Sequence, residues 1–248
     1  MTGELAAHGL HRSFGDLLVL AGVDLLARPG QVLSVLGPSG CGKSTLLRLL
    51  AGFEAPTAGQ VLLDGVPVGG PSPDRGMVAQ AGGLFPWLSL RDNLAYGPRA
   101  RGAPRDAVRR TVDELLAATG LVGFAGALPR ALSGGMRQRA AIAQVLANRP
   151  PVLLLDEPFG ALDAQTRLRM HEWLGTLLAE RPTTTVLVTH DVEEALLLGD
   201  RLVLLSARPA AVVDELAVPF PPHRGRAVLA DPDFVRLKAD VLERVLAG

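Results

Sequence analysis

Residues 37–45 of the chain, Gly-Pro-Ser-Gly-Cys-Gly-Lys-Ser-Thr, match the phosphate-binding pattern G-x-x-x-x-G-K-[ST]. Glycines let successive backbone N–H groups point into one hollow, and a helix that starts there adds unpaired donors and a positive dipole end. Lys43 can then reach the β- and γ-phosphates of a nucleotide, and the Ser44 hydroxyl can bind Mg²⁺. The predicted nucleotide contacts in this loop are Gly37, Pro38, Ser39, Gly40, Cys41, Gly42, Lys43, Ser44 and Thr45.

The segments on either side of this loop have the character that the motif requires. Residues 31–36 alternate and are partly β-branched, which predicts a strand, and residues 45–51 are rich in helix formers and end at Gly52. The chain has only two lysines, Lys43 and Lys238. A lysine that is alone in the first two hundred residues and lies in such a loop is hard to explain as a generic surface charge.

Two further predicted strands end in side chains that could act on a phosphate. Residues 152–155 are wholly apolar and are followed by Asp156 and Glu157, as in a central parallel strand whose carboxyl end lies beside the loop. Asp156 would hold Mg²⁺, and Glu157 would polarise the attacking water. Residues 184–189 form another buried strand that ends in His190, for which a γ-phosphate contact is favoured over the usual structural role of a lone histidine.

Gln80 and Phe14 are each compatible with a role in the nucleotide site and also with an ordinary structural or surface position. Gln80 ends the predicted strand 76–80, where an amide could bind the metal and hold a water, but spacing alone supports an exposed loop residue equally well. Phe14 lies ahead of the loop, in a region of short antiparallel strands between residues 5 and 26. It could stack on a purine or pack in the core.

A second glycine-rich turn predicts another anion site. Ser133 has the character of a helix N-cap, and Gly134 and Gly135 expose backbone donors where that helix begins. Two phosphate-type sites for one nucleotide suggest that they face each other across two chains. Asp163 is predicted to cap the helix that runs to residue 178.

Composition limits the class of protein. A chain of 248 residues with 48% hydrophobic side chains can bury a full core, and its zero net charge argues against bulk nucleic-acid binding. The single cysteine excludes an intramolecular disulfide and a cysteine zinc cluster. No apolar run approaches the roughly 18 residues of a membrane span, and residues 1–4 lack the layout of a signal peptide. We therefore expect a soluble chain, or one that attaches to a membrane through a partner.

Residues 87–149 differ from the rest in both pattern and charge. They read as helical, with an amphipathic helix over residues 104–118 and a capping box at Ser89 and Asp92. They contain ten arginines and four acidic residues. This excess predicts a solvated basic face, or alternatively a surface that faces anionic headgroups or a charged partner.

The motifs 37–45, Gln80, 132–136, 154–158, 162–163 and His190, in this order, closely resemble the ATP-binding-cassette (ABC) ATPases over nearly the whole chain. The resemblance implies an α/β fold: a P-loop NTPase (RecA-like) core with a mixed sheet, an N-terminal antiparallel β subdomain and an inserted α-helical subdomain. It implies one ABC ATPase domain over residues 1–248, with the core formed by 1–86 and 150–248 and the helical subdomain by 87–149. It further implies a head-to-tail homodimer with ATP and Mg²⁺ as ligands.

In such a dimer, Lys43 of one copy and Ser133 of the other hold the same ATP, and Glu157 and His190 carry out hydrolysis with Lys43 and Gln80. The resemblance implies these metal ligands: Ser44, Gln80 and Asp156. It also implies these nucleotide contacts outside the loop: Phe14, Gln80, Ser133, Gly134, Gly135, Asp163 and His190.

Within this superfamily, residues 84–93, 73–78 and 205–216 are similar to the nitrate/sulfonate/taurine importer group. That group implies uptake of a small solute, a separate integral membrane permease, an extracytoplasmic solute-binding protein, and a peripheral position on the cytoplasmic side of the membrane. Ala79, the 81–83 segment and Gln144 depart from the group's pattern, the first two beside the expected permease contact. The alternatives are a soluble ABC ATPase that acts on a macromolecule such as the ribosome or DNA, and a nucleotide-binding module without catalysis.

Overall fold

The computed structural model describes residues 2–80, 82–221 and 224–247. Its central sheet has six strands: β3 (Val32–Leu36), β6 (Arg75–Val78), β7 (Val152–Asp156), β8 (Thr184–Thr189), β9 (Arg201–Leu205) and β10 (Val212–Ala217). The strand order is β10-β9-β3-β8-β7-β6, parallel except for β10, which pairs antiparallel with β9. Every residue of β3, β7 and β8 is buried, as their apolar sequences require in a sheet covered on both faces.

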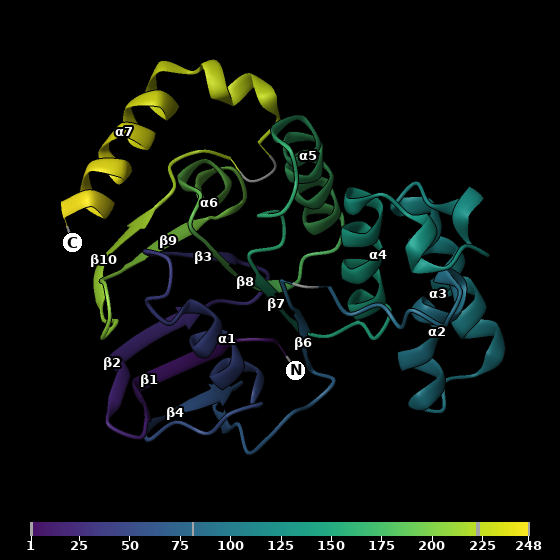
Figure 1. Ribbon diagram of the computed structural model, residues 1–248, viewed down its shortest axis with the longest axis horizontal. Helices are drawn as coiled ribbons and strands as arrows, with labels where there is room; N and C mark the ends of the chain where they lie inside the picture. The colour runs from purple at the N-terminus through teal and green to yellow at the C-terminus, as the bar shows by residue number, and fades with distance from the viewer. Residues whose placement is uncertain (1, 81, 222–223, 248) are drawn as a thin grey trace.

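A second, antiparallel sheet contains β1 (Leu5–Phe14), β2 (Leu17–Ala27), β4 (Ala58–Leu63) and β5 (Val66–Pro67) in the order β2-β1-β4-β5. Helix α1 (Lys43–Ala51) lies between the two sheets in Figure 1. One apolar cluster joins all three layers: Leu10 and Val23 from the antiparallel sheet, Leu46 from α1, and Val35 from the central sheet. The shared core fixes the start of α1, and therefore the phosphate loop, against both sheets.

The helical part of the chain forms a lobe beside the sheets (Figure 1). It contains α2 (Leu90–Ala100), α3 (Arg105–Ala118) and α4 (Gly134–Leu146), with short 3₁₀ turns at Val122–Phe124 and Pro129–Ala131. Its apolar faces pack on one another and on the β7 side of the central sheet. Ser89 caps α2, which is one half of the predicted capping box: its hydroxyl oxygen accepts from the Asp92 backbone N–H at 3.1 Å.

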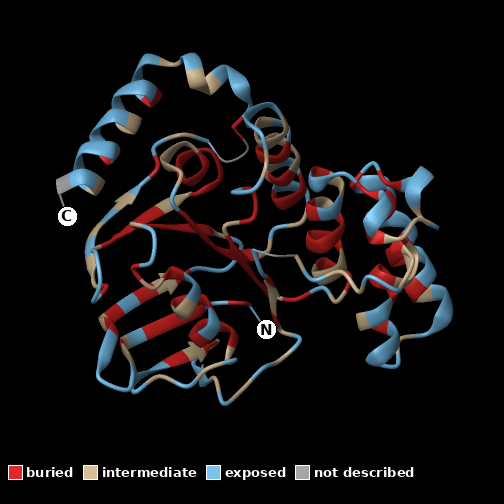
Figure 2. Ribbon diagram, in the orientation of Figure 1, coloured by how far each residue is buried: buried red, intermediate tan, exposed pale blue. Residues whose placement is uncertain are grey.

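Three helices complete the core: α5 (Ala164–Glu180), α6 (Val192–Leu198) and α7 (Pro232–Ala247). A 3₁₀ turn at Arg226–Ala230 precedes α7. Helix α6 packs on β3 and β8, and α7 lies outside α6, with Phe234 and Val241 buried in their interface. Figure 2 shows that buried residues concentrate in the central sheet and on the inner faces of the helices.

The predicted fold class is confirmed in both sheets and in the helical lobe. One boundary differs from the prediction: β6 ends at Val78, so Gln80 lies in the turn after the strand and is exposed. The predicted 81–83 departure falls partly on Ala81, which is outside the described residues. Among the described residues, no helix combines the length and apolar character needed to cross a membrane.

Candidate nucleotide-binding site

The phosphate loop connects the end of β3 to the start of α1. Gly40 and Gly42 have φ values of 74° and 127°, a region that only glycine adopts without strain. A Cβ on Gly42 would also lie 2.8 Å from Cγ1 of Val19, so the loop packs directly on β2. The Lys43 ammonium is almost fully buried and donates to the carbonyl oxygens of Gly37 at 2.8 Å and Pro38 at 3.0 Å. These bonds fold the lysine back along its own loop.

Asp156 ends β7 next to the start of α1. The Ser44 hydroxyl donates to its Oδ1 at 3.0 Å, which joins the two residues that were predicted to bind Mg²⁺. Burial raises the pKa of Asp156, although the hydrogen bond from Ser44 opposes this shift. A cation there would offset the cost of the buried charge.

The oxygen donors of this pair suit Mg²⁺, which proteins hold through one or two side chains while phosphates and water supply the other ligands. Within the described part of the chain, no group of three or more His, Cys, Asp or Glu side chains could hold a metal ion by itself. The residues therefore fit a metal that arrives with a nucleotide. They do not form an all-protein cage.

Glu157 is the point at which the predicted catalytic residues meet. Its Oε2 lies 3.1 Å from Nδ1 of His190 and accepts from Nε2 of Gln80 at 3.2 Å, while its Oε1 lies 3.7 Å from Nζ of Lys43. Its own backbone has a φ of 43°, and its N–H donates to the Val188 carbonyl of the neighbouring strand at 3.0 Å. A non-glycine residue in this region is strained, and such strain concentrates at functional sites.

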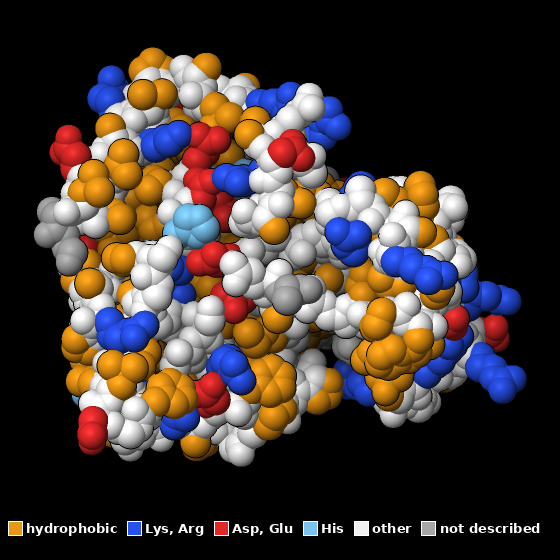
Figure 3. All heavy atoms as spheres, in the orientation of Figure 1, with side chains coloured by type: hydrophobic (Ala, Val, Ile, Leu, Met, Phe, Trp, Pro, Cys, Tyr) orange, Lys and Arg blue, Asp and Glu red, His pale blue; other side chains and the backbone are white. Residues whose placement is uncertain are grey.

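These four side chains come from segments that are distant in the sequence. They meet because β3, β8, β7 and β6 are neighbours in a parallel sheet, so their carboxyl ends share one edge (Figure 1). Gln80 reaches Glu157 from the turn after β6, which favours the site interpretation over that of an isolated loop residue. In Figure 3, acidic and basic side chains gather around a histidine near the middle of this face.

A hollow of about 320 Å³ opens at the loop. It is lined by Phe14, Leu17, Val19, Gly40, Gly42, Lys43, Ser44, Thr45, Glu157 and Arg208. Phe14 is 45% exposed, so it is not a core residue. The Arg12 guanidinium lies 4.4 Å from its ring centroid, and this contact supports the ring at the rim of the hollow.

Sequence reasoning did not assign Arg208 to the site. Its Nε donates to the Gly40 carbonyl at 3.1 Å, so an arginine that follows β9 braces the phosphate loop. Because β9 pairs with β3, the segment after β9 lies next to the loop that follows β3. The sequence shows only that an arginine follows the predicted strand at residues 201–206. That this strand lies beside β3 can be known only from the strand order of the sheet.

The Ser133 turn and Asp163 do not line the hollow at the phosphate loop. The Ser133 hydroxyl caps α4 by accepting from the Met136 N–H at 3.3 Å, and Asp163 caps α5 by accepting from the Thr166 N–H at 3.0 Å. Hydrogen bonds from Thr166 lower the pKa of Asp163. No residue from 133–135 and no Asp163 atom lines the hollow at the loop; Gly134 lines a separate hollow of about 470 Å³ together with Gln80 and Glu157. Within one chain the two phosphate-type turns therefore line different hollows, and Glu157 lines both.

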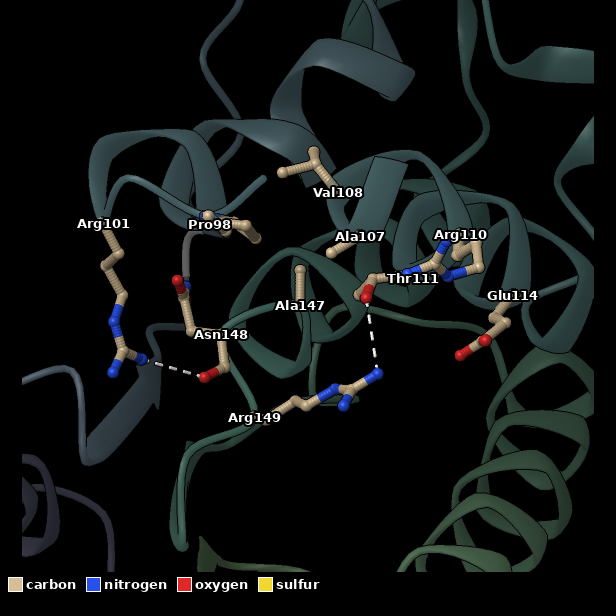
Figure 4. Close-up of a pocket in the computed structure, with 11 residues that line it drawn as sticks. Pro98, Arg101, Ala107, Val108, Arg110, Thr111, Glu114, Ala147, Asn148 and Arg149 are labelled. Atoms are coloured by element: carbon tan, nitrogen blue, oxygen red, sulfur yellow. Dashed lines mark hydrogen bonds between the residues drawn. The ribbon is translucent and has the colours of Figure 1, made fainter. Parts of the chain in front are cut away.

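The helical lobe has a further hollow of about 440 Å³ between the end of α2, α3 and the segment after α4 (Figure 4). Arg101 donates to the Asn148 carbonyl there at 3.0 Å, and Arg149 donates to Thr111 Oγ1 at 3.4 Å. None of its lining residues belongs to the predicted nucleotide site. Arg101, Arg110 and Arg149 of the arginine-rich segment therefore lie around this hollow of the helical lobe, whereas Arg137 lines the hollow that contains Gln80 and Glu157.

Comparison with known proteins agrees with this geometry. The family described as "ABC transporter" matches residues 20–160. The Taurine import ATP-binding protein TauB of Roseobacter denitrificans is 50% identical over 225 residues, which cover 89% of this chain and 84% of the relative.

Two solved structures are also similar. The dimeric ABC transporter cassette MJ0796 is 31% identical, with a TM-score of 0.77 over 88% of this chain and 100% of that one, and it is also known in a post-hydrolysis dimeric state bound to ADP and Pi. The cbiO1 protein of Clostridium perfringens, part of the ABC transporter complex cbiONQ, is 27% identical with a TM-score of 0.80, covering 99% and 98% of the two chains. The sequence match and the phosphate-site geometry together show that this chain belongs to the ABC transporter family of ATP-binding proteins.

Proposed function

We propose that this chain is the ATP-hydrolysing subunit of an importer that takes up taurine or a related small sulfonate through a separate membrane permease. The observation that carries the proposal is the convergence of Lys43, Gln80 and His190 on the carboxylate of Glu157, beside the Ser44–Asp156 pair. The 50% identity to a taurine import protein supports the choice of solute. A single domain serves this role, with residues 1–86 and 150–248 as the nucleotide-binding core and 87–149 as the helical subdomain.

In this proposal the loop N–H groups and Lys43 hold the β- and γ-phosphates of ATP, and Phe14 stacks on the base. Glu157 takes a proton from the attacking water, while His190 holds the γ-phosphate and keeps the Glu157 carboxylate oriented. Ser44, Gln80 and Asp156 hold Mg²⁺. When bound, this ion neutralises charge that develops on the phosphates.

The Ser133 turn acts from a second copy of the chain. Its serine hydroxyl and the N–H groups of Gly134 and Gly135 lie at a helix N-terminus, where a phosphate is stabilised. Asp163 lies at the nearby start of α5 and joins the same interface. Within one chain this turn and the loop line different hollows, which supports a shared site, because a head-to-tail pair brings each turn to the partner's ATP. The dimeric similar cassette agrees with this arrangement.

The proposed partners are a permease and, indirectly, an extracytoplasmic solute-binding protein, with this subunit peripheral on the cytoplasmic face of the inner membrane. The groove lined by Met77, Ala79, Gly83, Tyr96 and Gln144 between the core and the helical lobe is the proposed permease contact. A cassette that acts on a ribosome or on DNA is the alternative, and the zero net charge disfavours it.

The test is reconstitution of this chain with the permease and the solute-binding protein of a taurine importer. In proteoliposomes, the complex should hydrolyse ATP faster when the solute-binding protein is loaded with taurine than when it is empty. If another solute stimulates ATP hydrolysis and taurine does not, that solute replaces taurine as the proposed substrate. Purification with ribosomes or DNA, and with no membrane protein, would refute the importer function.

A further inference from the structure

A cluster of buried polar side chains lies directly behind His190. Glu194, on the first turn of α6, is 2% exposed; His171, on α5, is 4% exposed. Oε1 of Glu194 lies 3.8 Å from Nε2 of His171, and among the described residues neither of these atoms, nor Nδ1 of His171, has a hydrogen-bond partner. Buried polar atoms without partners are rare and need an explanation.

The other oxygen of Glu194 is connected to the site. The Thr189 hydroxyl donates to its Oε2 at 2.5 Å, and the same hydroxyl oxygen accepts from the Asp191 backbone N–H at 3.0 Å. Thr189 and Asp191 flank His190 in the sequence, so these bonds fix the backbone on both sides of the histidine. The His190 side chain itself is half exposed, and its Nδ1 contact with Glu157 is its one recorded side-chain polar contact among the described residues.

We propose that Glu194 is a positioning residue for His190: in its protonated form it holds Thr189 through one oxygen and faces His171 with the other, and so fixes the turn that presents His190 to Glu157. The inference rests on the proposed role of His190 in hydrolysis. Glu194 touches neither substrate nor metal in this account, and acts only through Thr189.

The protonated form of Glu194 provides a hydrogen-bond partner for both of its neighbours, Thr189 and His171. A neutral carboxyl has one O–H donor and one carbonyl acceptor, which match an unprotonated His171 nitrogen on one side and the Thr189 hydroxyl on the other. An ionised carboxylate could accept from His171 only in the Nε2–H tautomer, and it would place a full negative charge in a buried site whose facing imidazole is neutral, which is costly at this depth. The proposed hydrogen bond requires the 3.8 Å separation of Glu194 Oε1 and His171 Nε2 to shorten to about 3 Å.

Burial favours the same protonation state, while the neighbouring charges act in both directions. Burial raises the pKa of Glu194 to about 7 and lowers the pKa of His171 to about 4, so below about pH 7 the carboxyl holds the proton and the imidazole is neutral. The charged groups that face the cluster are Asp191 and Glu193 from α6, Arg167 from α5 and Glu157 from the end of β7. Asp191 is paired with Arg167 at 3.1 Å, and Glu193 is paired with Lys238 of α7 at 2.5 Å.

The consequence is a dependence of hydrolysis on the protonation of Glu194. When the buried carboxyl loses its proton, the negative charge repels Asp191 and Glu157 and disturbs the turn that carries His190. With a pKa of about 7, the protonated fraction falls about eightfold between pH 6.5 and pH 8. The value of kcat/KM, which reports ionisations of the free enzyme, should fall with it.

The experiment compares ATPase pH profiles of the full chain with Glu194→Gln, Glu194→Ala, Thr189→Val and the control Glu193→Gln. The amide of Glu194→Gln can donate to His171 and accept from Thr189 without titrating, so activity should remain at pH 6.5 and the alkaline fall attributed to Glu194 should disappear. Thr189→Val should lower kcat about tenfold or more and leave the Kd for ATP within twofold. Glu194→Ala should lower kcat in the same way. Glu193→Gln should keep the wild-type profile.

An alkaline limb in Glu194→Gln equal to that of the wild type, or a normal kcat in Thr189→Val, would overturn the inference. If Glu194→Ala fails to fold, infrared spectroscopy of the wild-type chain decides the protonation state: the carbonyl band of a buried protonated carboxyl should be present at pH 6, diminish by pH 8 and be missing in Glu194→Gln. A wild-type chain without that band at pH 6 refutes the protonated state.

His190→Ala separates this inference from the proposed function. If His190→Ala retains full turnover, the role of His190 fails and the positioning argument fails with it. If His190→Ala loses turnover while the Thr189 and Glu194 variants behave as the wild type, only the positioning role is wrong.

Discussion

Replacing Glu157 by glutamine tests the chemistry of the site directly. The change keeps the shape of the side chain and removes only its charge and basicity. The carboxylate lies 3.1 Å from His190 Nδ1 and 3.7 Å from Lys43 Nζ, so it is held at the centre of the site. Loss of a general base typically lowers turnover by about 10²–10⁴-fold, and each factor of ten corresponds to about 1.4 kcal/mol of barrier. We expect a barrier increase of about 3–5 kcal/mol in Glu157→Gln.

Nucleotide binding should survive, because the loop N–H groups and Lys43 are unchanged and Lys43 retains its bonds to the Gly37 and Pro38 carbonyls. Removal of a negative charge beside the expected γ-phosphate position should also let a dimer closed around ATP persist. The measurements are steady-state ATP hydrolysis, equilibrium titration of a fluorescent ATP analogue, and light scattering of the purified chain with Mg²⁺ and ATP.

The matched control is Glu172→Gln on the outer face of α5, where Glu172 pairs with Arg226 at 3.0 Å. It should leave turnover within twofold of the wild type. Turnover of Glu157→Gln within tenfold of the wild type would remove the general-base role from this glutamate. Weakened ATP binding in the variant would refute the view that the carboxylate serves hydrolysis alone.

Four further outcomes follow from the same structure. Ser133→Arg should abolish ATP-dependent dimerisation in light scattering and spare ATP binding by the monomer; an unchanged dimer would contradict the shared site. Asp163→Ala removes the cap on the Thr166 N–H and should lower the unfolding free energy measured in urea titrations, and an unchanged value would contradict the capping role. Leu153→Ala, in the centre of β7, should cost about 2–5 kcal/mol by the same method, and a cost below 1 kcal/mol would refute its place in the core. Burial raises the pKa of Glu194 from 4.5 to about 7, so between these pH values the folded chain holds the proton and the unfolded chain releases it. The wild-type chain therefore loses stability as the pH rises through this range. The stability of Glu194→Gln relative to the wild type, measured by urea unfolding, should rise by about 3 kcal/mol between pH 4.5 and 7.

Much of the fold could be predicted from the sequence because its signals are local. The apolar run at 152–155 and the largely β-branched run at 184–189 predict central strands, and both are buried throughout. The capping residues Ser89, Ser133 and Asp163 fix helix starts through bonds to backbone groups three residues away, and all three bonds are present. The phosphate loop is equally local, since its glycines and lysine are consecutive.

Contacts that depend on strand order could not be predicted in this way. The exposure of Phe14 and the brace from Arg208 to Gly40 depend on how the antiparallel sheet and the segment after β9 pack around the loop. The pairing of Glu194 with Thr189 and His171 is of the same kind, because α5 and α6 carry these side chains to one buried point. No periodicity in the chain encodes that meeting.

The sequence by itself determined which residues can do phosphate chemistry and which segments end in them. The tertiary structure decided that Gln80, Glu157, His190 and Lys43 share one site, because four parallel strands align their carboxyl ends at a single edge. It also decided that the Ser133 turn and the phosphate loop of one chain line different hollows. The physical reason is that side-chain type and helix capping act within a few residues, whereas sheet order is set by the burial of whole apolar faces.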